Sequence, residues 1–196
     1  MTTAATTVTG SETEVILRNV RLGVFPDLFA ARQFDGKGEF KYKAVLIMPA
    51  DSAERKAVDA AILAAATAKW GAKADGYLKS LRGQKKEFCF LDGAMLGRPE
   101  YEGMWVLSAS RRQKDGAPKV LARDKTPLTI ESGKPYPGCW VHAKIAIWSQ
   151  DNAFGRGMRC TLLAVQFVKD GDAFSGAGPA NDVGFEEIAD ESDDLL

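Results

Sequence analysis

Two long stretches near the carboxyl end constrain the fold most, because their length and their apolar alternation favour a β-sheet. Residues 139–148 read CWVHAKIAIW, and residues 158–168 read MRCTLLAVQFV. Apolar side chains that recur at every second position are typical of a strand with one buried face. The polar, glycine-rich link SQDNAFGRG lies between the two stretches. They therefore predict two long strands joined by a loop.

Three earlier segments also predict strands. They are residues 15–25 (VILRNVRLGVF), 40–48 (FKYKAVLIM) and 104–112 (MWVLSASRR). In the second of them, alternation places Lys41 and Lys43 on the face opposite Tyr42. The third is followed by Asp115-Gly116 and then by PKVLA, residues 118–122, a pattern that predicts a hairpin.

One segment has helical spacing instead. Its apolar residues recur every four positions, at Val58, Ile62, Ala66 and Trp70. Asp51 and Glu54 can form a capping box at its start, and Gly71 can end it. A shorter helix is expected around residues 77–81. The whole pattern predicts a mainly β protein, an antiparallel Greek-key barrel with a helical insertion at about residues 51–83.

The chain of 196 residues is long enough for one domain with appendages. Residues 1–12 are rich in Thr and Ala, and residues 173–196 are rich in Gly, Ala, Asp and Glu. We expect both ends to be disordered, with a folded domain between residues 13 and 172.

The formal charge of +0 hides an uneven distribution. Residues 170–196 hold nine acidic side chains and no Lys or Arg, so the rest of the chain has 26 basic and 17 acidic residues and a formal charge of +9. A basic body with an acidic tail indicates interaction with nucleic acid or a tail that binds a partner.

The residues that catalysis most often needs are scarce. His142 is the single histidine, and it lies within a predicted strand. No Ser/His/Asp set, phosphate-binding loop or metal-ligand spacing is present, so we expect a non-enzymatic protein with no cofactor and no metal. The sequence has neither a run of ~20 apolar residues nor a secretory signal, which predicts a cytoplasmic protein.

Basic and aromatic residues lie side by side on the predicted strands and loops. Single-stranded nucleic acid is bound by such pairs, because cations contact phosphates while aromatic rings stack on unpaired bases. Trp70 and Trp105 are expected in the core instead. The predicted DNA-binding residues are Lys41, Lys43, Arg111, Arg112, Lys119, Arg123, Lys144, Trp148, Phe154, Arg156 and Arg159.

The chain ends in EEIADESDDLL. A tethered polyanion can occupy a DNA site at high effective concentration, while an apolar end can anchor in a partner's pocket. We therefore expect this tail to compete with DNA and to recruit partner proteins. The residues predicted to do so are Asp190, Glu191, Asp193, Asp194, Leu195 and Leu196.

Residues 138–171, together with RNVRLGVFPDLF and KYKAVLIMP, resemble the single-stranded DNA-binding proteins of tailed bacteriophages. The resemblance implies an OB-fold barrel with a helical insertion, no catalysis, and binding of DNA strands exposed in phage replication and recombination, in the host cytoplasm. It also implies an acidic tail that contacts replication proteins. The better-known members of that family end in an aromatic residue, whereas this chain ends in two leucines.

Three functions remain open at this stage. The first is a sequence-tolerant single-stranded DNA-binding protein that self-associates on DNA. The second is a phage assembly or interaction factor, which accounts for the tail but not for the pairing of basic and aromatic residues. The third is a recombination nuclease.

Overall fold

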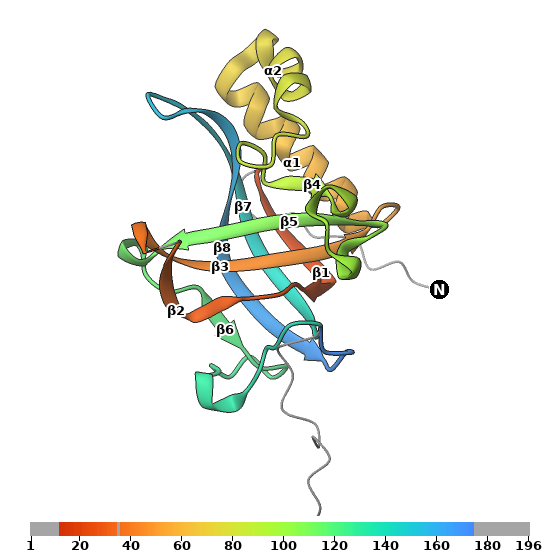
Figure 1. Cartoon of the computed structure of the whole chain (residues 1–196), viewed down its shortest axis with the longest axis vertical. Helices are drawn as coiled ribbons and strands as arrows, with labels where there is room; N and C mark the ends of the chain where they lie inside the picture. Colours follow the sequence, from red (N-terminus) through yellow and green to blue (C-terminus); the bar gives the residue numbers. More distant parts are fainter. Residues whose placement is uncertain (1–11, 35, 175–196) are drawn as a thin grey trace, which may run out of the picture.

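The computed structural model describes residues 12–34 and 36–174, and its centre is a closed ring of five strands (Figure 1). The order around the ring is β1–β3–β5–β8–β7 and back to β1. Every pairing is antiparallel except β5 with β8, where Ser110 pairs with Thr161 in parallel. This is the strand order of an OB-fold barrel. The ring strands are β1 (Glu14–Leu22), β3 (Lys37–Pro49), β5 (Met104–Arg112), β7 (Trp140–Asn152) and β8 (Gly155–Lys169).

Three shorter strands extend the ring. Strand β2 pairs with β3, β4 pairs with β5, and β6 pairs in parallel with β8. They are β2 (Asp27–Phe34), β4 (Phe90–Asp92) and β6 (Lys119–Leu121). Five short segments of the described chain form single turns of 3-10 helix: Gly71–Lys73, Gly93–Leu96, Pro99–Tyr101, Gln113–Asp115 and Ile130–Ser132.

Alternation along the strands builds the core, as predicted. The inward side chains of β3 and those of β7 are buried in the same cluster. Since neighbouring residues of a strand point to opposite faces, Lys41 and Lys43 point outward where Tyr42 and Ala44 point in. The buried residues of β7 are Val141, Ala143, Ile145 and Ile147.

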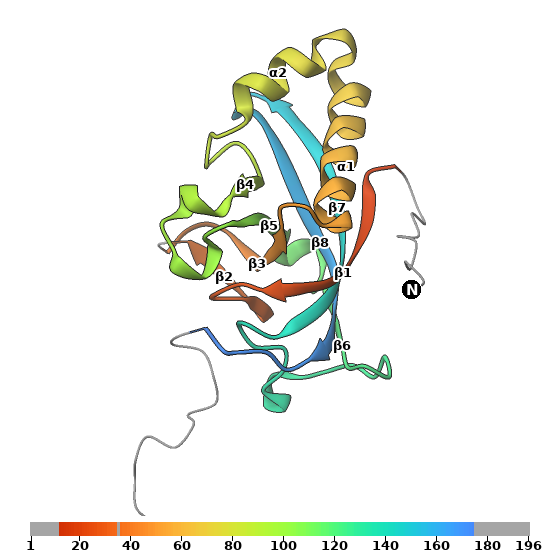
Figure 2. The ribbon, with the colours of Figure 1, turned by 90° about the vertical axis from the view of Figure 1, so that its right-hand side faces the viewer.

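Helix α1 (Ala53–Trp70) lies against β7 and β1, and α2 (Ala74–Leu81) follows it toward the far end of the β7–β8 hairpin (Figure 2). The buried residues of α1 include Val58, Ile62 and Trp70. The expected mainly β barrel with one helical insertion is therefore confirmed. The prediction of disordered ends concerns residues that lie largely outside the described chain, and the described segment continues to Phe174, whose ring is buried.

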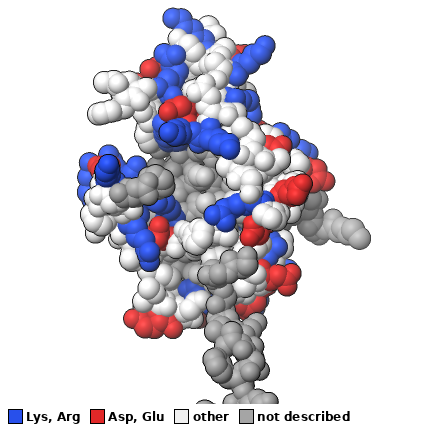
Figure 3. Space-filling model, viewed as in Figure 1, with Lys and Arg blue, Asp and Glu red and all other residues white. Residues whose placement is uncertain are grey.

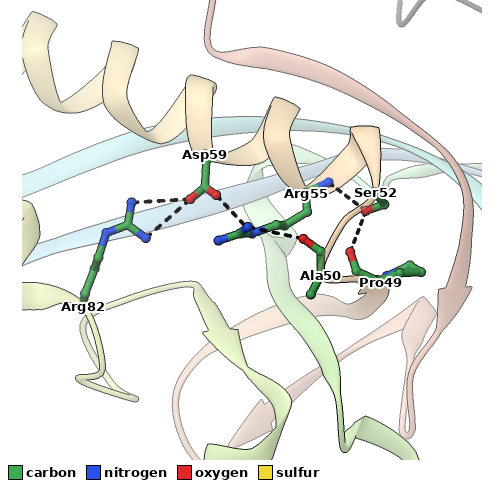
Figure 4. Close-up of polar contacts among 6 residues, drawn as sticks. All are labelled: Pro49, Ala50, Ser52, Arg55, Asp59 and Arg82. Carbon is green, nitrogen blue, oxygen red and sulfur yellow. Dashed lines mark hydrogen bonds and ion pairs between the residues drawn. The ribbon is translucent and has the colours of Figure 1, made fainter.

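The predicted cap of α1 was wrong by one residue. Ser52, not Asp51, is the N-cap: its Oγ accepts a hydrogen bond from the Arg55 N–H at 3.1 Å and donates one to the Pro49 carbonyl at 2.7 Å (Figure 4). Arg55 and Arg82 both reach Asp59, one turn further along α1, at 3.3 and 3.4 Å. The first turn is thus joined to the end of α2.

The hairpin predicted from residues 104–112 and 118–122 is wrong. The chain does turn at Gln113–Asp115, but β6 then crosses to β8, where Lys119 pairs with Ala164. Strand β5 pairs with β8 only at Thr161, so the edge of β8 after Thr161 is free to pair with β6. The predicted loop at residues 149–157 is mostly strand, with a turn of two residues at Ala153 and Phe154, and strand β2 was missed.

Replacing Ser52 by Ala removes an N-cap hydrogen bond, so we expect the free energy of unfolding to fall by about 1 kcal/mol. Asp51→Ala is the matched control and should leave stability nearly unchanged. Urea denaturation followed by circular dichroism measures both. A larger loss for Asp51→Ala than for Ser52→Ala would contradict the assignment of the cap.

Candidate nucleic-acid interface

A cleft of about 800 Å³ opens where β3 begins and β5 ends, beside β8. Residues 85–89, which precede β4, form its other wall. Two acidic side chains, Glu39 and Asp115, also line it. In the space-filling view, Lys and Arg side chains lie around a hollow in this face of the molecule (Figure 3). The six basic residues that line the cleft are Lys41, Lys85, Lys86, Arg111, Arg112 and Arg159.

The register between β3 and β5 brings outward cations from distant parts of the sequence together. Lys41 lies opposite Arg112, and Lys43 lies opposite Ser110. Directly opposed residues of an antiparallel pair share one face of the sheet. Ser108 and Ser110 lie on the same face and also line the cleft.

Two of the cleft arginines also fix its rim. The Arg111 guanidinium donates to the Asp115 and Gly116 carbonyls at 2.6 and 2.8 Å. Arg112 Nε lies 2.7 Å from Asp115 Oδ2, and this hydrogen bond holds the pKa of the Asp115 carboxyl below its ordinary value. Asp115 therefore stays ionised and offsets part of the positive charge at the rim.

Arg159 holds the two walls of the cleft together. Its guanidinium pairs with Glu87 at 2.7 Å, donates to the Gln150 side chain at 2.8 Å, and donates to the Lys86 carbonyl. Lys41, Lys85 and Lys86, by contrast, make no ion pair with any residue in the described part of the chain. These three ammonium groups are available to an anionic ligand.

Trp148 is the exposed aromatic residue of the cleft. Its side chain is 45% exposed, and its indole N–H donates to Thr161 Oγ1 at 3.1 Å. This hydrogen bond fixes the orientation of the ring. Phe88 also lines the cleft but is buried, so it belongs to the floor.

The other predicted site residues lie outside the cleft lining. Lys43 is next to it on the outward face, and Lys144 forms an ion pair with Glu14 at 3.0 Å. Lys119 and Arg123 lie on β6 and just after it. Phe154, at the turn of the β7–β8 hairpin, is 90% exposed. Arg156 has a structural contact, described next.

The long hairpin is braced against the helices. The Trp70 indole N–H donates to Asp151 Oδ2 at 2.8 Å, and this bond, aided by Arg156, holds the pKa of Asp151 below its ordinary value. Arg156 lies 3.4 Å from the same carboxylate and 3.7 Å from the ring centroid of Tyr77. The brace positions the strands that carry Trp148 and Arg159.

Lys85 and Lys86 were missed as site residues. They belong to the basic stretch RGQKKEF, whose three cations within five residues were the available signal. Its position beside β5 and β8 depends on contacts such as Cys89 N–H to the Met158 carbonyl, at 3.1 Å, which join residues far apart in the sequence.

Other kinds of site are not found in the described residues. Within residues 12–34 and 36–174, no group of three or more His, Cys, Asp or Glu side chains could hold a metal ion. None of the helices there has the length and apolar character needed to cross a membrane.

The model of the family described as the single-stranded DNA-binding protein of Enterobacter phage Enc34 matches residues 13–196. The chain belongs to this family. A curated relative, putative protein p50 of Acyrthosiphon pisum secondary endosymbiont phage 1, is 36% identical over 186 residues, which cover 93% of this chain and 98% of the relative.

Solved structures agree with this assignment. The Enc34 single-stranded DNA-binding protein in complex with single-stranded DNA is 29% identical and has a TM-score of 0.69, over 84% of this chain and 90% of that one. Its C-terminal truncation is 31% identical, with a TM-score of 0.67 over the same shares. The gp2.5 protein of bacteriophage T7, at 14% identity and a TM-score of 0.54 over 93% of this chain and all of that one, shares the fold.

The floor of the cleft should be chemically inert. Burial raises the pKa of the Cys89 thiol to about 12 and that of Cys160 well above its ordinary value. Burial likewise raises the pKa of Cys139 to about 11. We expect all three cysteines to resist iodoacetamide at pH 8 in the folded protein and to react in denaturant. Rapid labelling of Cys89 in the folded protein, measured by mass spectrometry, would show that the floor opens.

Proposed function

We propose that this protein binds single-stranded DNA through the cleft, with little sequence preference and without catalysis. The observation that supports this most is the combination of three unpaired lysines with the exposed ring of Trp148 in one cleft. Lysines can contact phosphates whatever the base, and every base has a face that stacks on an aromatic ring. The family and the DNA complex of its Enc34 member support the same proposal.

In this proposal the phosphate backbone runs along the outward face of β3 and β5. Lys41 and Arg112 contact it from the barrel, and Lys85 and Lys86 contact it from the opposite wall. A base stacks on Trp148. The remaining predicted residues, Lys43, Lys119, Arg123, Lys144, Phe154 and Arg156, would act at the margins of this path.

Substituting Lys41, Lys85 and Lys86 together by Ala should weaken binding at low salt. Each lost phosphate contact lowers the slope of log affinity against log salt by about 0.7 for single strands, so the slope should fall by about 2. Fluorescence anisotropy with a labelled oligonucleotide measures this. The control replaces the exposed Lys56, Lys73 and Lys79 of the helical insertion and should keep the wild-type slope. An equal change in both variants would contradict the placement of the cleft.

We further propose that the protein serves phage DNA replication and recombination in the host cytoplasm, and that copies associate on DNA. Exposed strands occur in both processes, and proteins of this kind commonly cover them cooperatively. If the chain were a nuclease instead, DNA incubated with it and Mg²⁺ or Mn²⁺ would be cleaved, whereas a binding protein leaves the DNA intact.

The acidic tail is proposed to compete with DNA and to recruit replication proteins. Its residues Asp190, Glu191, Asp193, Asp194, Leu195 and Leu196 lie outside the described chain. The described segment ends at Phe174, which packs with Ile47 and Val106. These two residues lie opposite each other on the outward face of β3 and β5, the face that carries Lys41 and Arg112. The tail thus begins on the face where DNA is proposed to bind.

Deleting residues 175–196 should raise the affinity for single-stranded DNA, most strongly at low salt, because a tethered competitor is removed. The deletion begins after Phe174, so that this buried ring stays in place. Anisotropy titrations of the full and shortened chains at two salt concentrations test it. Identical affinities would limit the tail to solubility or partner binding.

A further inference from the structure

One exposed aromatic residue outside the cleft has an unusual backbone. Phe25 lies between β1 and β2, is 70% exposed, and has a φ of 53°. Positive φ is rare for bulky side chains, because the β-carbon crowds the backbone there. Residues held in such conformations concentrate at binding and catalytic sites, where the surrounding structure enforces them.

The neighbours of Phe25 hold it in place. Gly23 donates to the Val45 carbonyl at 2.7 Å, and an added β-carbon would lie only 2.7 Å from the Val45 side chain. The buried Val24 donates its N–H to the Tyr101 hydroxyl at 3.1 Å. Pro26 follows and fixes the next φ. The ring of Phe25 is therefore presented to solvent on a rigid support.

A cation accompanies this ring. The Arg98 guanidinium lies 5.3 Å from the centroid of Phe25, and it makes no ion pair with any residue the structure describes. The high exposure of Phe25 leaves ring surface free for a second planar group. Glu100 and Glu102 are close in sequence to Arg98, so the local net charge is small. Stacking, more than charge, is what this site can offer.

The pair stands at the end of the outward face that leads from the cleft. Val45, which Gly23 contacts, lies opposite Ser108, and Ser108 lines the cleft. Along β5, Ser108 and Arg112 are four residues apart, a distance of about 13 Å that spans the cleft. Phe25 also belongs to the connection between the first two strands of the ring, β1 and β3, which is a binding loop in OB-folds. Figure 1 shows β3 and β5 side by side along this path.

We propose that Phe25 and Arg98 form a second nucleotide site, in which a base stacks on Phe25 and Arg98 contacts the adjoining phosphate. This inference rests on the proposed binding of single-stranded DNA. A DNA strand seated in the cleft continues past Ser108 to the connection that covers Val45, and so reaches Phe25. The site is therefore used only by strands long enough to extend beyond the cleft.

The test compares oligonucleotides of about 4 and about 16 nucleotides, the range of lengths that one OB-fold covers. Phe25→Ala should weaken binding of the long oligonucleotide about ten-fold, which is within the range for loss of one stacked base, and leave the short one unchanged. Phe25→Tyr keeps the ring and should bind like the wild type. Because stacking carries the contact, the salt slope of Phe25→Ala should stay at the wild-type value.

Ile130→Ala is the matched control, since Ile130 is a large apolar residue with a similar exposure of 65% at another place on the surface. It should bind both oligonucleotides like the wild type. If Phe25→Ala bound the long oligonucleotide as tightly as the wild type does, the second site would be overturned, and Phe25 would be left as a surface for a protein partner. Failure of the wild type to bind either oligonucleotide would instead overturn the proposed function.

Discussion

The register between β3 and β5 is the constraint on which the rest of the structure depends. Nine consecutive pairs, from Lys41 with Arg112 to Pro49 with Met104, leave no freedom to slide. A shift by one residue would turn Tyr42, Ala44 and Leu46 toward solvent and move the lysines inward. One alignment therefore decides both which side chains fill the barrel and which charged side chains face outward. The core and the cationic surface are two faces of the same pairing.

The cleft lies where two neighbouring strands of the barrel share the fewest paired residues. Strands β5 and β8 meet through the single pair Ser110 and Thr161, whereas β7 and β8 pair along most of their length. A seam with so few ladder bonds leaves room for solvent and for side chains from elsewhere. Arg159 compensates by joining the hairpin to Glu87 across the opening. The sparse pairing of β5 with β8 and the Arg159–Glu87 ion pair thus lie at the same opening.

Local patterns in the sequence were enough to predict the five strands of the ring and the two helices, but not the short strands β2 and β4 or the partners that each strand acquires. Alternation identified β3 and β7 because burial on one face imposes it directly. The prediction that residues 118–122 return to β5 was wrong, because these residues pair with the free edge of β8, and that edge exists only once the barrel has closed. The site shows the same division: Lys41, Arg111, Arg112, Trp148 and Arg159 line the cleft, whereas Lys144 is neutralised by Glu14, 130 residues away in the sequence.

The end of the described chain is held against the barrel by contacts with Arg21 and Gly138. Arg21 donates to the Asp172 carbonyl at 2.7 Å and lies 4.6 Å from the ring of Phe174, while Gly138 comes so close to Asp172 that no other side chain fits there. Substitutions up to Phe174 must respect this packing. Because Arg21, Gly138 and Asp172 hold one another, a substitution at any one of them disturbs the other two, and these three positions are expected to change together or not at all.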